Sequence, residues 1–298
     1  MPQTKTLIVG AGYIGEAFAD FAHAKGPEVV ACTASEDSAK ALAGVKPYPV
    51  AAADVSRLGE VERLRADHGA FDLVLFSASS GRGGAERYRS VYFEGAQNIA
   101  ATFKEARLIF TGSTSVYAQI DGGWVDESSP AEPDRETGKW LRQAEDVVLG
   151  SGGSVARLAG IYGPGRSVLL RKFLAGRAVI EGDGEKWLNQ AHRDDIVNAL
   201  WTIWASPATA SSIYNVCDNQ PLTQRECYAG LARHFDRLLP PSAPPDYDRK
   251  RGWTNKRVAN ARLRALGWEP RYPSFLRSIE AGLDPGLEGA EGTPANSA

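Results

Sequence analysis

Hydrophobic positions near the start of the chain change from a continuous run to helical spacing. The run is Thr6–Gly10, with the sequence TLIVG, and apolar residues then recur at helical spacing from Ile14 to Ala22. Gly26 stands where a helix C-cap is expected. The pattern therefore predicts a strand, a turn that contains glycines, and an amphipathic helix that begins inside the glycine segment.

The same alternation of strand-like and helix-like segments continues to about residue 160. Further strands are predicted for the apolar runs Glu28–Thr33, Tyr48–Ala53, Phe71–Ala78, Arg107–Phe110 and Ser154–Ala159. Helices are predicted after Ser56, which is an expected N-cap, and over Tyr88–Ala106 and Gly138–Leu149. Nearly continuous apolar strands that alternate with helices indicate a parallel sheet covered on both faces. The predicted fold class is α/β, a doubly wound parallel sheet of Rossmann type with a smaller C-terminal lobe.

The pattern breaks into shorter pieces after the YGPG segment that ends at Gly165. Helices are predicted for Val168–Leu174 and Ile196–Trp204, and a strand is predicted for Ser212–Cys217. Residues 284–298 are mostly Gly, Pro, Glu and small residues, which cannot bury enough apolar area to become ordered. We therefore expect a sheet domain at residues 1–165, a lobe at 166–283 that is partly interleaved with the sheet, and a disordered tail at 284–298.

Composition and charge narrow the classes of function. The 298 residues are 43% hydrophobic, and 34 basic against 36 acidic residues give a net charge of −2, so no overall basic field exists to hold nucleic acid or an anionic membrane. No apolar run approaches the ~20 residues that span a bilayer, and because Met1–Lys5 leads directly into a predicted strand, no signal peptide is expected. Cys32, Cys217 and Cys227 lack metal-type spacing and are expected to be reduced thiols. We expect a cytoplasmic protein that binds a small molecule, with no nucleic-acid, membrane or metal partner.

The segment GAGYIG has GxGxxG spacing directly after a buried strand and at the start of a helix, the context in which this spacing indicates dinucleotide binding. Gly10 permits the tight turn, Gly12 lets the backbone approach a pyrophosphate, and Gly15 allows the helix to pack on the strand. The N–H groups of the first helical turn then face the phosphates, with Tyr13 and Ile14 beside them. A plain tight turn is the alternative.

The tip of the second predicted strand bears on the choice between NAD and NADP. It carries neither an acid nor an arginine at the position where an acid would bind the ribose of NAD. The hydroxyls of Thr33 and Ser35 suit the phosphate of NADP, whereas Glu36 and Asp37 would repel it. The balance slightly favours NADP over NAD.

Two more strand ends are assigned to the same site. Asp54, followed by Val55, is expected to accept a hydrogen bond from the adenine amino group, and capping of the next helix is the equal alternative. The residues after the fourth strand, Ser77, Ala78 and Ser79, are expected to contact the dinucleotide as well.

With these motifs the chain resembles the extended short-chain dehydrogenase/reductase superfamily and, within it, the NAD-dependent epimerase/dehydratase family. The resemblance covers nearly all of residues 5–283. Its motifs are GAGYIG, Asp54-Val55, Thr111–Ala118, Asp126–Pro130, Arg157–Gly165, His192–Asp195, Tyr214–Val216 and Leu266–Pro270. The resemblance implies that the N-terminal lobe holds NAD(P) and that the C-terminal lobe holds the substrate, often a nucleotide-sugar. Dimers are common in that family, so a homodimer is among the states it implies.

Members with full activity carry a Ser or Thr, followed by a Tyr and a Lys spaced YxxxK on one helix face. The resemblance implies that the lysine lowers the pKa of the tyrosine, which exchanges a proton with the substrate. Ser113 matches the Ser, but the flanking family positions place Thr137 at the tyrosine and Leu141 at the lysine. If Lys139 is taken as the lysine instead, its partner is Arg135. The chain is thus similar to the atypical subgroup that lacks the proton-relay pair.

Two residues are candidates to replace the missing pair beside Ser113. Tyr117 is expected in a loop at the carboxyl edge of the sheet, where packing against the second lobe is the alternative role. Lys139 is expected in the first turn of a helix, where a solvated surface lysine is the alternative. Tyr92 also stands where the family usually has an asparagine.

Three basic residues are candidates to bind the substrate. Arg82 lies in a second glycine-rich loop, and Arg166 follows the YGPG segment, so each is placed to hold an anionic group, with a surface arginine as the alternative. His192 precedes a helix expected near Asp195 and is either a proton shuttle or a structural histidine. The function expected is an NAD(P)-dependent oxidoreductase or epimerase with an unconventional acid/base group. The alternative is a non-catalytic dinucleotide-binding sensor or scaffold.

Overall fold

Seven parallel strands form the central sheet of the chain. The computed structural model describes residues 4–81, 83–206, 210–248 and 252–282, and the sheet order is β12-β7-β5-β4-β1-β2-β3. The strands are β1 (Lys5–Val9), β2 (Glu28–Thr33), β3 (Val50–Ala52), β4 (Leu73–Phe76), β5 (Arg107–Ser113), β7 (Ser154–Leu158) and β12 (Ile213–Val216). Every neighbouring pair is parallel, which confirms the predicted doubly wound α/β fold.

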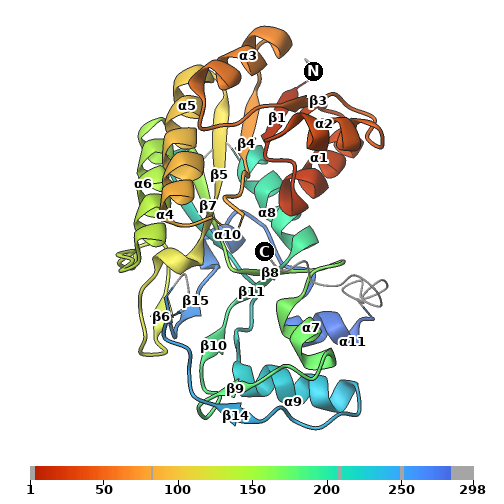
Figure 1. Ribbon diagram of the computed structural model, residues 1–298, viewed down its shortest axis with the longest axis vertical. Coiled ribbons are helices and arrows are strands. Elements are labelled where there is room, and N and C mark those ends of the chain that lie inside the picture. Colours follow the sequence, from red (N-terminus) through yellow and green to blue (C-terminus); the bar gives the residue numbers. More distant parts are fainter. Residues whose placement is uncertain (1–3, 82, 207–209, 249–251, 283–298) are drawn as a thin grey trace.

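Helices cover both faces of the sheet, as Figure 1 shows. One face carries α3 (Leu58–His68), α4 (Ala85–Tyr88), the π-helix η1 (Arg89–Glu94), α5 (Gly95–Thr102) and α6 (Glu136–Gly150). The other face carries α1 (Tyr13–Lys25) and α8 (Arg193–Ala205), which pack together, while α2 (Glu36–Ala43) packs beside β2 and β3. The strands are apolar on both sides because each side lies under a helix layer.

The C-terminal lobe lies below the sheet in Figure 1 and has its own apolar core, formed by residues such as Tyr162, Phe173, Tyr228 and Phe275. Its helices are α7 (Val168–Leu174), α9 (Gln224–His234) and α11 (Phe275–Glu280). Helix α10 (Ala261–Arg264) packs against β12 of the sheet, and a short 3-10 helix, η2 (Thr114–Val116), follows β5. The short strands of the lobe are β6 (Trp124–Val125), β8 (Gly160–Tyr162), β9 (Ile180–Glu181), β10 (Trp187–Leu188), β11 (Gln190–His192), β13 (Leu222–Thr223), β14 (Ser242–Ala243) and β15 (Arg257–Val258).

Local differences from the predicted elements have identifiable causes. The helix expected after Ser56 begins at Leu58 with Arg57 as its N-cap, because the Ser56 hydroxyl donates to Asp54 Oδ1 at 2.8 Å instead. The single helix expected over Tyr88–Ala106 is interrupted by η1. Helix α2 was not predicted. The expected tail at 284–298 lies outside the described residues.

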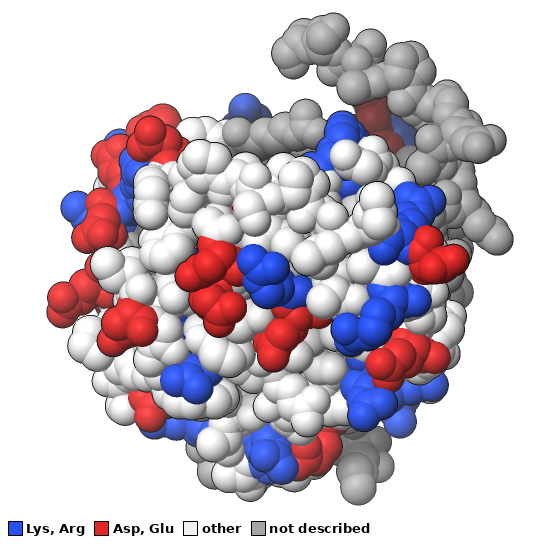
Figure 2. All heavy atoms as spheres, turned by 90° about the horizontal axis from the view of Figure 1, so that it is seen from below, with Lys and Arg blue, Asp and Glu red and all other residues white. Residues whose placement is uncertain are grey.

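Charged side chains of both signs are interspersed on the face that carries the C-terminal lobe, shown in Figure 2. No broad field of one sign covers this face, in keeping with the net charge of −2. Within the described part of the chain, no helix has the length and apolarity needed to cross a membrane.

A buried polar network ties α6 to the sheet. Arg157 on β7 is 1% exposed and donates to both carboxylate oxygens of Glu145 on α6, at 2.9 and 2.6 Å. Its remaining nitrogen donates to the Tyr117 hydroxyl at 2.8 Å, and that hydroxyl donates to Asn215 Oδ1 on β12 at 3.0 Å. The network therefore joins β7, β12, α6 and the segment after β5.

Replacing Glu145 by Gln is expected to lower the free energy of unfolding by about 3–5 kcal/mol, because it leaves the buried guanidinium of Arg157 without its counter-charge. Urea denaturation measures this loss. As a control, Glu280→Gln breaks the exposed Arg277–Glu280 pair at 2.8 Å and is expected to cost under about 1 kcal/mol. Equal losses in the two variants would contradict the structural role given to Arg157 and Glu145.

Candidate functional site

A cleft of about 490 Å³ follows the carboxyl ends of the parallel strands. Its walls come from the turn between β1 and α1, from the ends of β2, β3, β4, β5 and β7, and from α4, η1 and α6. Of the residues predicted to hold a dinucleotide, those in its wall are Gly10, Gly12, Tyr13, Ile14, Thr33, Asp54, Val55, Ser77, Ala78 and Ser79. This edge of a doubly wound sheet is where ligands bind in such folds.

The glycine turn has the geometry that the spacing predicts. Gly10 has φ of +97°, and a Cβ there would lie 2.3 Å from the backbone nitrogen of Ala78. Gly15 is not in the cleft wall, since a Cβ on it would lie 2.1 Å from the Gly10 carbonyl oxygen on the packed side of the helix. At Gly12 a Cβ would meet nothing within 4 Å. This residue is the N-cap of α1 and supplies no side-chain cap, so the amides of the first turn are left for another acceptor.

These features fit an anionic group at the N-terminus of α1. Uncapped amides and the positive end of the helix dipole favour negative charge, and the open space at Gly12 lets that charge come close to the backbone. A pyrophosphate is the group that this turn would hold.

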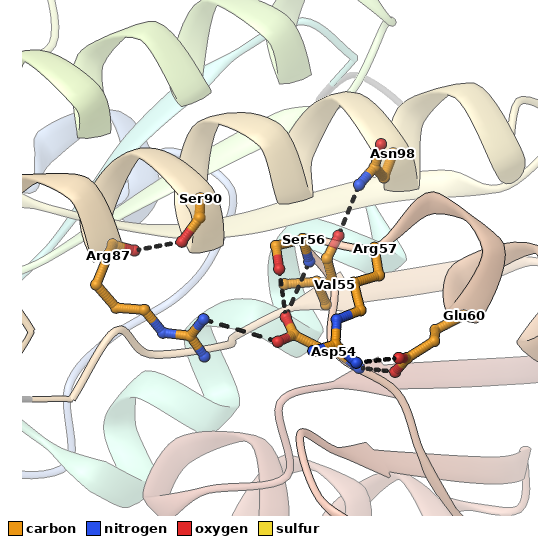
Figure 3. A network of polar contacts seen from close by, with 8 residues as sticks. All are labelled: Asp54, Val55, Ser56, Arg57, Glu60, Arg87, Ser90 and Asn98. Carbon is orange, nitrogen blue, oxygen red and sulfur yellow. Dashed lines mark hydrogen bonds and ion pairs between the residues drawn. The ribbon is translucent and has the colours of Figure 1, made fainter.

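Figure 3 shows the polar network at the β3 end of the cleft. Asp54 Oδ1 accepts from the backbone nitrogen and hydroxyl of Ser56, at 3.1 and 2.8 Å, and Asp54 Oδ2 lies 3.7 Å from Arg87 Nη1. Burial raises the pKa of Asp54, but the Ser56 hydrogen bonds and the charges of Arg87 and Arg57 outweigh it and lower that pKa below its usual range. Asp54 is therefore a carboxylate in the cleft wall that also closes a local turn with Ser56.

Residues at the β2 tip differ from the prediction in one respect. Ser35 is absent from the cleft wall because it is the N-cap of α2, where its hydroxyl accepts from the backbone nitrogen of Ser38 at 3.4 Å and donates to the Ser38 hydroxyl at 3.0 Å. Ser38 itself is in the wall, together with Thr33. The sequence contains a signal for the capping role of Ser35, since Ser followed by Glu-Asp-Ser is a typical helix start.

The opposite end of the cleft lies at β4, β5 and β7. Ser113 at the end of β5 is in the wall, and its Oγ accepts from the backbone nitrogen of Ser115 at 3.2 Å. Tyr92 from η1 and Leu141 from α6 complete this end. Leu141 also lines a second cavity of about 400 Å³, so the two cavities meet at this side chain.

The second cavity lies between the first turn of α6 and the C-terminal lobe. Its wall includes Thr137 and Arg135 from the start of α6, and Tyr247 and Trp253 from the lobe. The rings of Tyr247 and Trp253 lie 5.5 Å apart. Arg135 Nη2 donates to the Tyr247 carbonyl at 3.1 Å, which ties the two sides together.

Neither candidate for the missing acid/base pair lies in these cavity walls. Tyr117 is fully buried, with its hydroxyl bonded to Arg157 and Asn215, and burial raises its pKa. Lys139 is on the exposed side of α6. The alternative roles, a packed aromatic ring and a solvated lysine, describe what is observed.

The residues predicted to bind the substrate lie in different surroundings. Arg166 is in the cleft wall, with its guanidinium 5.1 Å from the centre of the Tyr13 ring. His192 is 1% exposed and caps α8 by accepting from the backbone nitrogen of Asp194 at 3.2 Å; burial lowers its pKa to about 4. It is absent from both cavity walls, which favours the structural role. Arg82 lies outside the described residues.

Comparison with known proteins identifies the family. The profile of the NAD-dependent epimerase/dehydratase family matches residues 6–217. The chain belongs to this family. It is 29% identical to the protein YeeZ of Escherichia coli over 281 residues, which cover 91% of this chain and 97% of YeeZ.

Solved structures of other proteins have a similar fold. One is a putative NAD-dependent epimerase/dehydratase from Methylobacillus flagellatus, with 27% identity and a TM-score of 0.72 over 93% of this chain and 97% of that one. Another is a dTDP-glucose 4,6-dehydratase from Streptomyces venezuelae, with NAD and TYD bound. Its identity is 21% and its TM-score is 0.76 over 94% of this chain and 96% of that one, a likeness that concerns the fold.

Lys256 carries a buried amine, which the sequence pattern did not predict. It is 4% exposed, and among the described residues its ammonium group donates to Thr254 Oγ1 at 2.8 Å and makes no ion pair. Burial, with the nearby charge of Lys186, lowers its pKa to about 7. Thr254 lines the second cavity, so this amine lies directly behind that wall.

The pKa of Lys256 predicts a pH dependence of stability. Between about pH 7 and the ordinary lysine value of 10.5 the unfolded chain keeps a proton that the folded chain releases, so the free energy of unfolding rises with pH. In Lys256→Met this rise is expected to disappear, and the variant should be about 1–4 kcal/mol more stable below pH 7, where the buried charge is fully present in the wild type.

Urea denaturation at several pH values measures both effects. Lys139→Met, which removes an exposed lysine from α6, is the matched control and is expected to keep the wild-type profile. A Lys256→Met profile that parallels the wild type would contradict the lowered pKa.

Proposed function

We propose that the cleft binds a nicotinamide dinucleotide, with its diphosphate at the N-terminus of α1. The observation that carries this proposal is the uncapped first turn of α1 beside the open space at Gly12, within a cleft of about 490 Å³. Family membership supports it, as does the NAD bound in the dehydratase of similar fold. The adenylate half would lie toward Asp54, and the nicotinamide half toward Ser113.

We further propose that NADP binds more tightly than NAD. Thr33 and Ser38 line the cleft at the β2 tip, where an acid that would bind the ribose diol of NAD is absent from the wall. In this proposal Ser38, and not Ser35 as the sequence predicted, would bind the phosphate of NADP. The carboxylates of Glu36 and Asp37 reduce this preference through their negative charge.

The reaction proposed is that of an oxidoreductase or epimerase acting on a small metabolite or a nucleotide-sugar-like substrate. A bound nicotinamide supplies hydride transfer. The substrate would occupy the second cavity, which meets the cleft at Leu141, and the Ser113 hydroxyl would bind its oxygen. A cytoplasmic location is part of the proposal, and Cys32, Cys217 and Cys227 are all free and buried.

Gly12→Ala tests the binding site. A Cβ at this position meets nothing within 4 Å in the protein, so the variant is expected to unfold at the wild-type temperature. The same methyl group would stand where the diphosphate approaches the backbone, so the affinity for NADP and NAD should fall at least about tenfold. Titration calorimetry with both coenzymes measures this, and the wild type is expected to bind NADP more tightly.

Gly59→Ala on α3 is the control, because its Cβ would also meet open space but lies outside the cleft. Its coenzyme affinity should match that of the wild type. A wild-type protein that is folded and yet gives no heat with either coenzyme would refute the proposed function.

A non-catalytic dinucleotide-binding sensor or scaffold is the second candidate function. The observation that favours it is the pair Thr137 and Leu141, which stand on α6 where catalytic family members place a tyrosine and a lysine. Leu141 supplies no proton-exchanging group at the junction of the two cavities. Coenzyme binding would then alter a surface that contacts a partner.

Turnover separates the two candidates. The wild type is screened with nucleotide-sugars and small carbonyl compounds by the absorbance of the reduced nicotinamide. For an enzyme, Ser113→Ala is expected to lower kcat by about 100-fold, the cost of losing one hydrogen-bond donor to a developing negative charge, while coenzyme affinity stays unchanged. Coenzyme binding without turnover across the screen would favour the sensor.

A further inference from the structure

Among the described residues, two tyrosines line the cleft, Tyr13 and Tyr92. The Tyr13 hydroxyl donates to the Pro164 carbonyl at 2.9 Å and is therefore occupied. Tyr92 lies in the π-helix η1, between α4 and α5. Such single π turns change the direction of side chains within a helix and occur frequently at functional sites.

The Tyr92 side chain is held rigidly. It is 6% exposed, and its ring packs edge-on against Tyr88 and Phe110, with centroids 5.0 and 6.2 Å away. Its phenolic oxygen accepts the backbone N–H of Ser80 at 3.3 Å. Because this oxygen is already an acceptor, the phenolic proton remains to be donated, and no acceptor for it is found within the described parts of the chain.

The sheet order places Tyr92 on one side of the diphosphate position. β1 and the glycine turn lie between β2 and β4, so a dinucleotide that crosses the turn has one half over β2 and β3 and the other over β4, β5 and β7. Asp54 and Thr33 mark the first half. Ser80 follows β4 and Phe110 belongs to β5, so the partners of Tyr92 belong to the second half.

A buried hydroxyl beside Tyr92 also lacks a partner. Ser80 is 7% exposed, and its Oγ makes no hydrogen bond with any described residue. Across this end of the cleft, Leu141 offers no polar atom from α6. Polar side chains at this end are supplied from the β4–β5 side and include Ser113 and Tyr92.

We infer that Tyr92 donates its phenolic proton to the second nucleoside of the bound dinucleotide, at its ribose hydroxyls, and thereby positions the nicotinamide half. The inference rests on the proposed function, since it assumes that a dinucleotide occupies the cleft. A ribose diol is a suitable hydrogen-bond acceptor for a phenol. The Leu141 side chain on α6 cannot make a hydrogen bond to the ligand, and the Tyr92 phenol would make one from the opposite side. Tyr92 is a positioning residue in this chain.

Titration calorimetry with two ligands tests the inference. NADP, or NAD if it binds more tightly, contains both nucleosides, whereas ADP lacks the second one. Tyr92→Phe is expected to weaken coenzyme binding about tenfold, the loss of one hydrogen bond, and to change ADP affinity less than twofold. ADP binding also shows that the variant is folded, because the phenyl ring retains its packing on Tyr88 and Phe110.

Tyr228→Phe is the matched control, since Tyr228 is buried in the C-terminal lobe and absent from the cleft wall. It should leave both affinities unchanged. Unchanged coenzyme affinity in Tyr92→Phe, or equal losses for coenzyme and ADP, would overturn the inference while leaving the proposed function intact. A wild-type protein that binds neither ligand would overturn both.

Discussion

The bidentate ion pair between Arg157 and Glu145 fixes the end of the cleft that lies away from Asp54. Arg157 belongs to β7, and the next residue, Leu158, is in the cleft wall. Glu145 belongs to α6, one turn beyond Leu141, which separates the cleft from the second cavity. Both partners are almost completely buried, so neither can leave the other without exposing an uncompensated charge to the apolar interior. The pair sets where α6 lies on the sheet and hence the width of this end.

The two ends of the cleft offer different kinds of polar groups to a ligand. At α1 the binding groups are backbone amides, and the requirement on the sequence is the absence of side chains, as at Gly12. At β4, β5 and β7 the polar groups are side chains, including Ser113 and Tyr92. In the proposed complex, backbone amides would donate to the diphosphate that every dinucleotide shares, whereas side chains would contact the reacting end. A chain with Thr137 and Leu141 on α6 can therefore keep the first end while the second end differs.

Prediction from sequence succeeded where short-range pattern decides structure. The strands, the turn at Gly10 and the helix that ends at Gly26 follow from apolar periodicity and from glycine conformations within a few residues. It was less reliable where two local roles compete for one side chain. Ser35 was expected to bind a phosphate and instead caps α2, and Ser56 was expected to cap α3 and instead donates to Asp54. Each hydroxyl bonds to a residue two or three positions away in the chain, and the sequence does not rank the local partners that are available.

The sequence by itself determined the α/β class, the glycine turn and the absence of a YxxxK pair, because these depend on residue type and spacing along one segment. Tertiary structure alone decided which polar groups share a cavity. Tyr117 follows β5 and Tyr92 lies in η1, yet the Tyr117 hydroxyl is bonded to Arg157 and Asn215, whereas Tyr92 lines the cleft. The amine of Lys256 is buried through tertiary packing in the same way. The reason is that burial and hydrogen-bond partners come from residues far apart in the chain, which only the packing of strands and helices brings together.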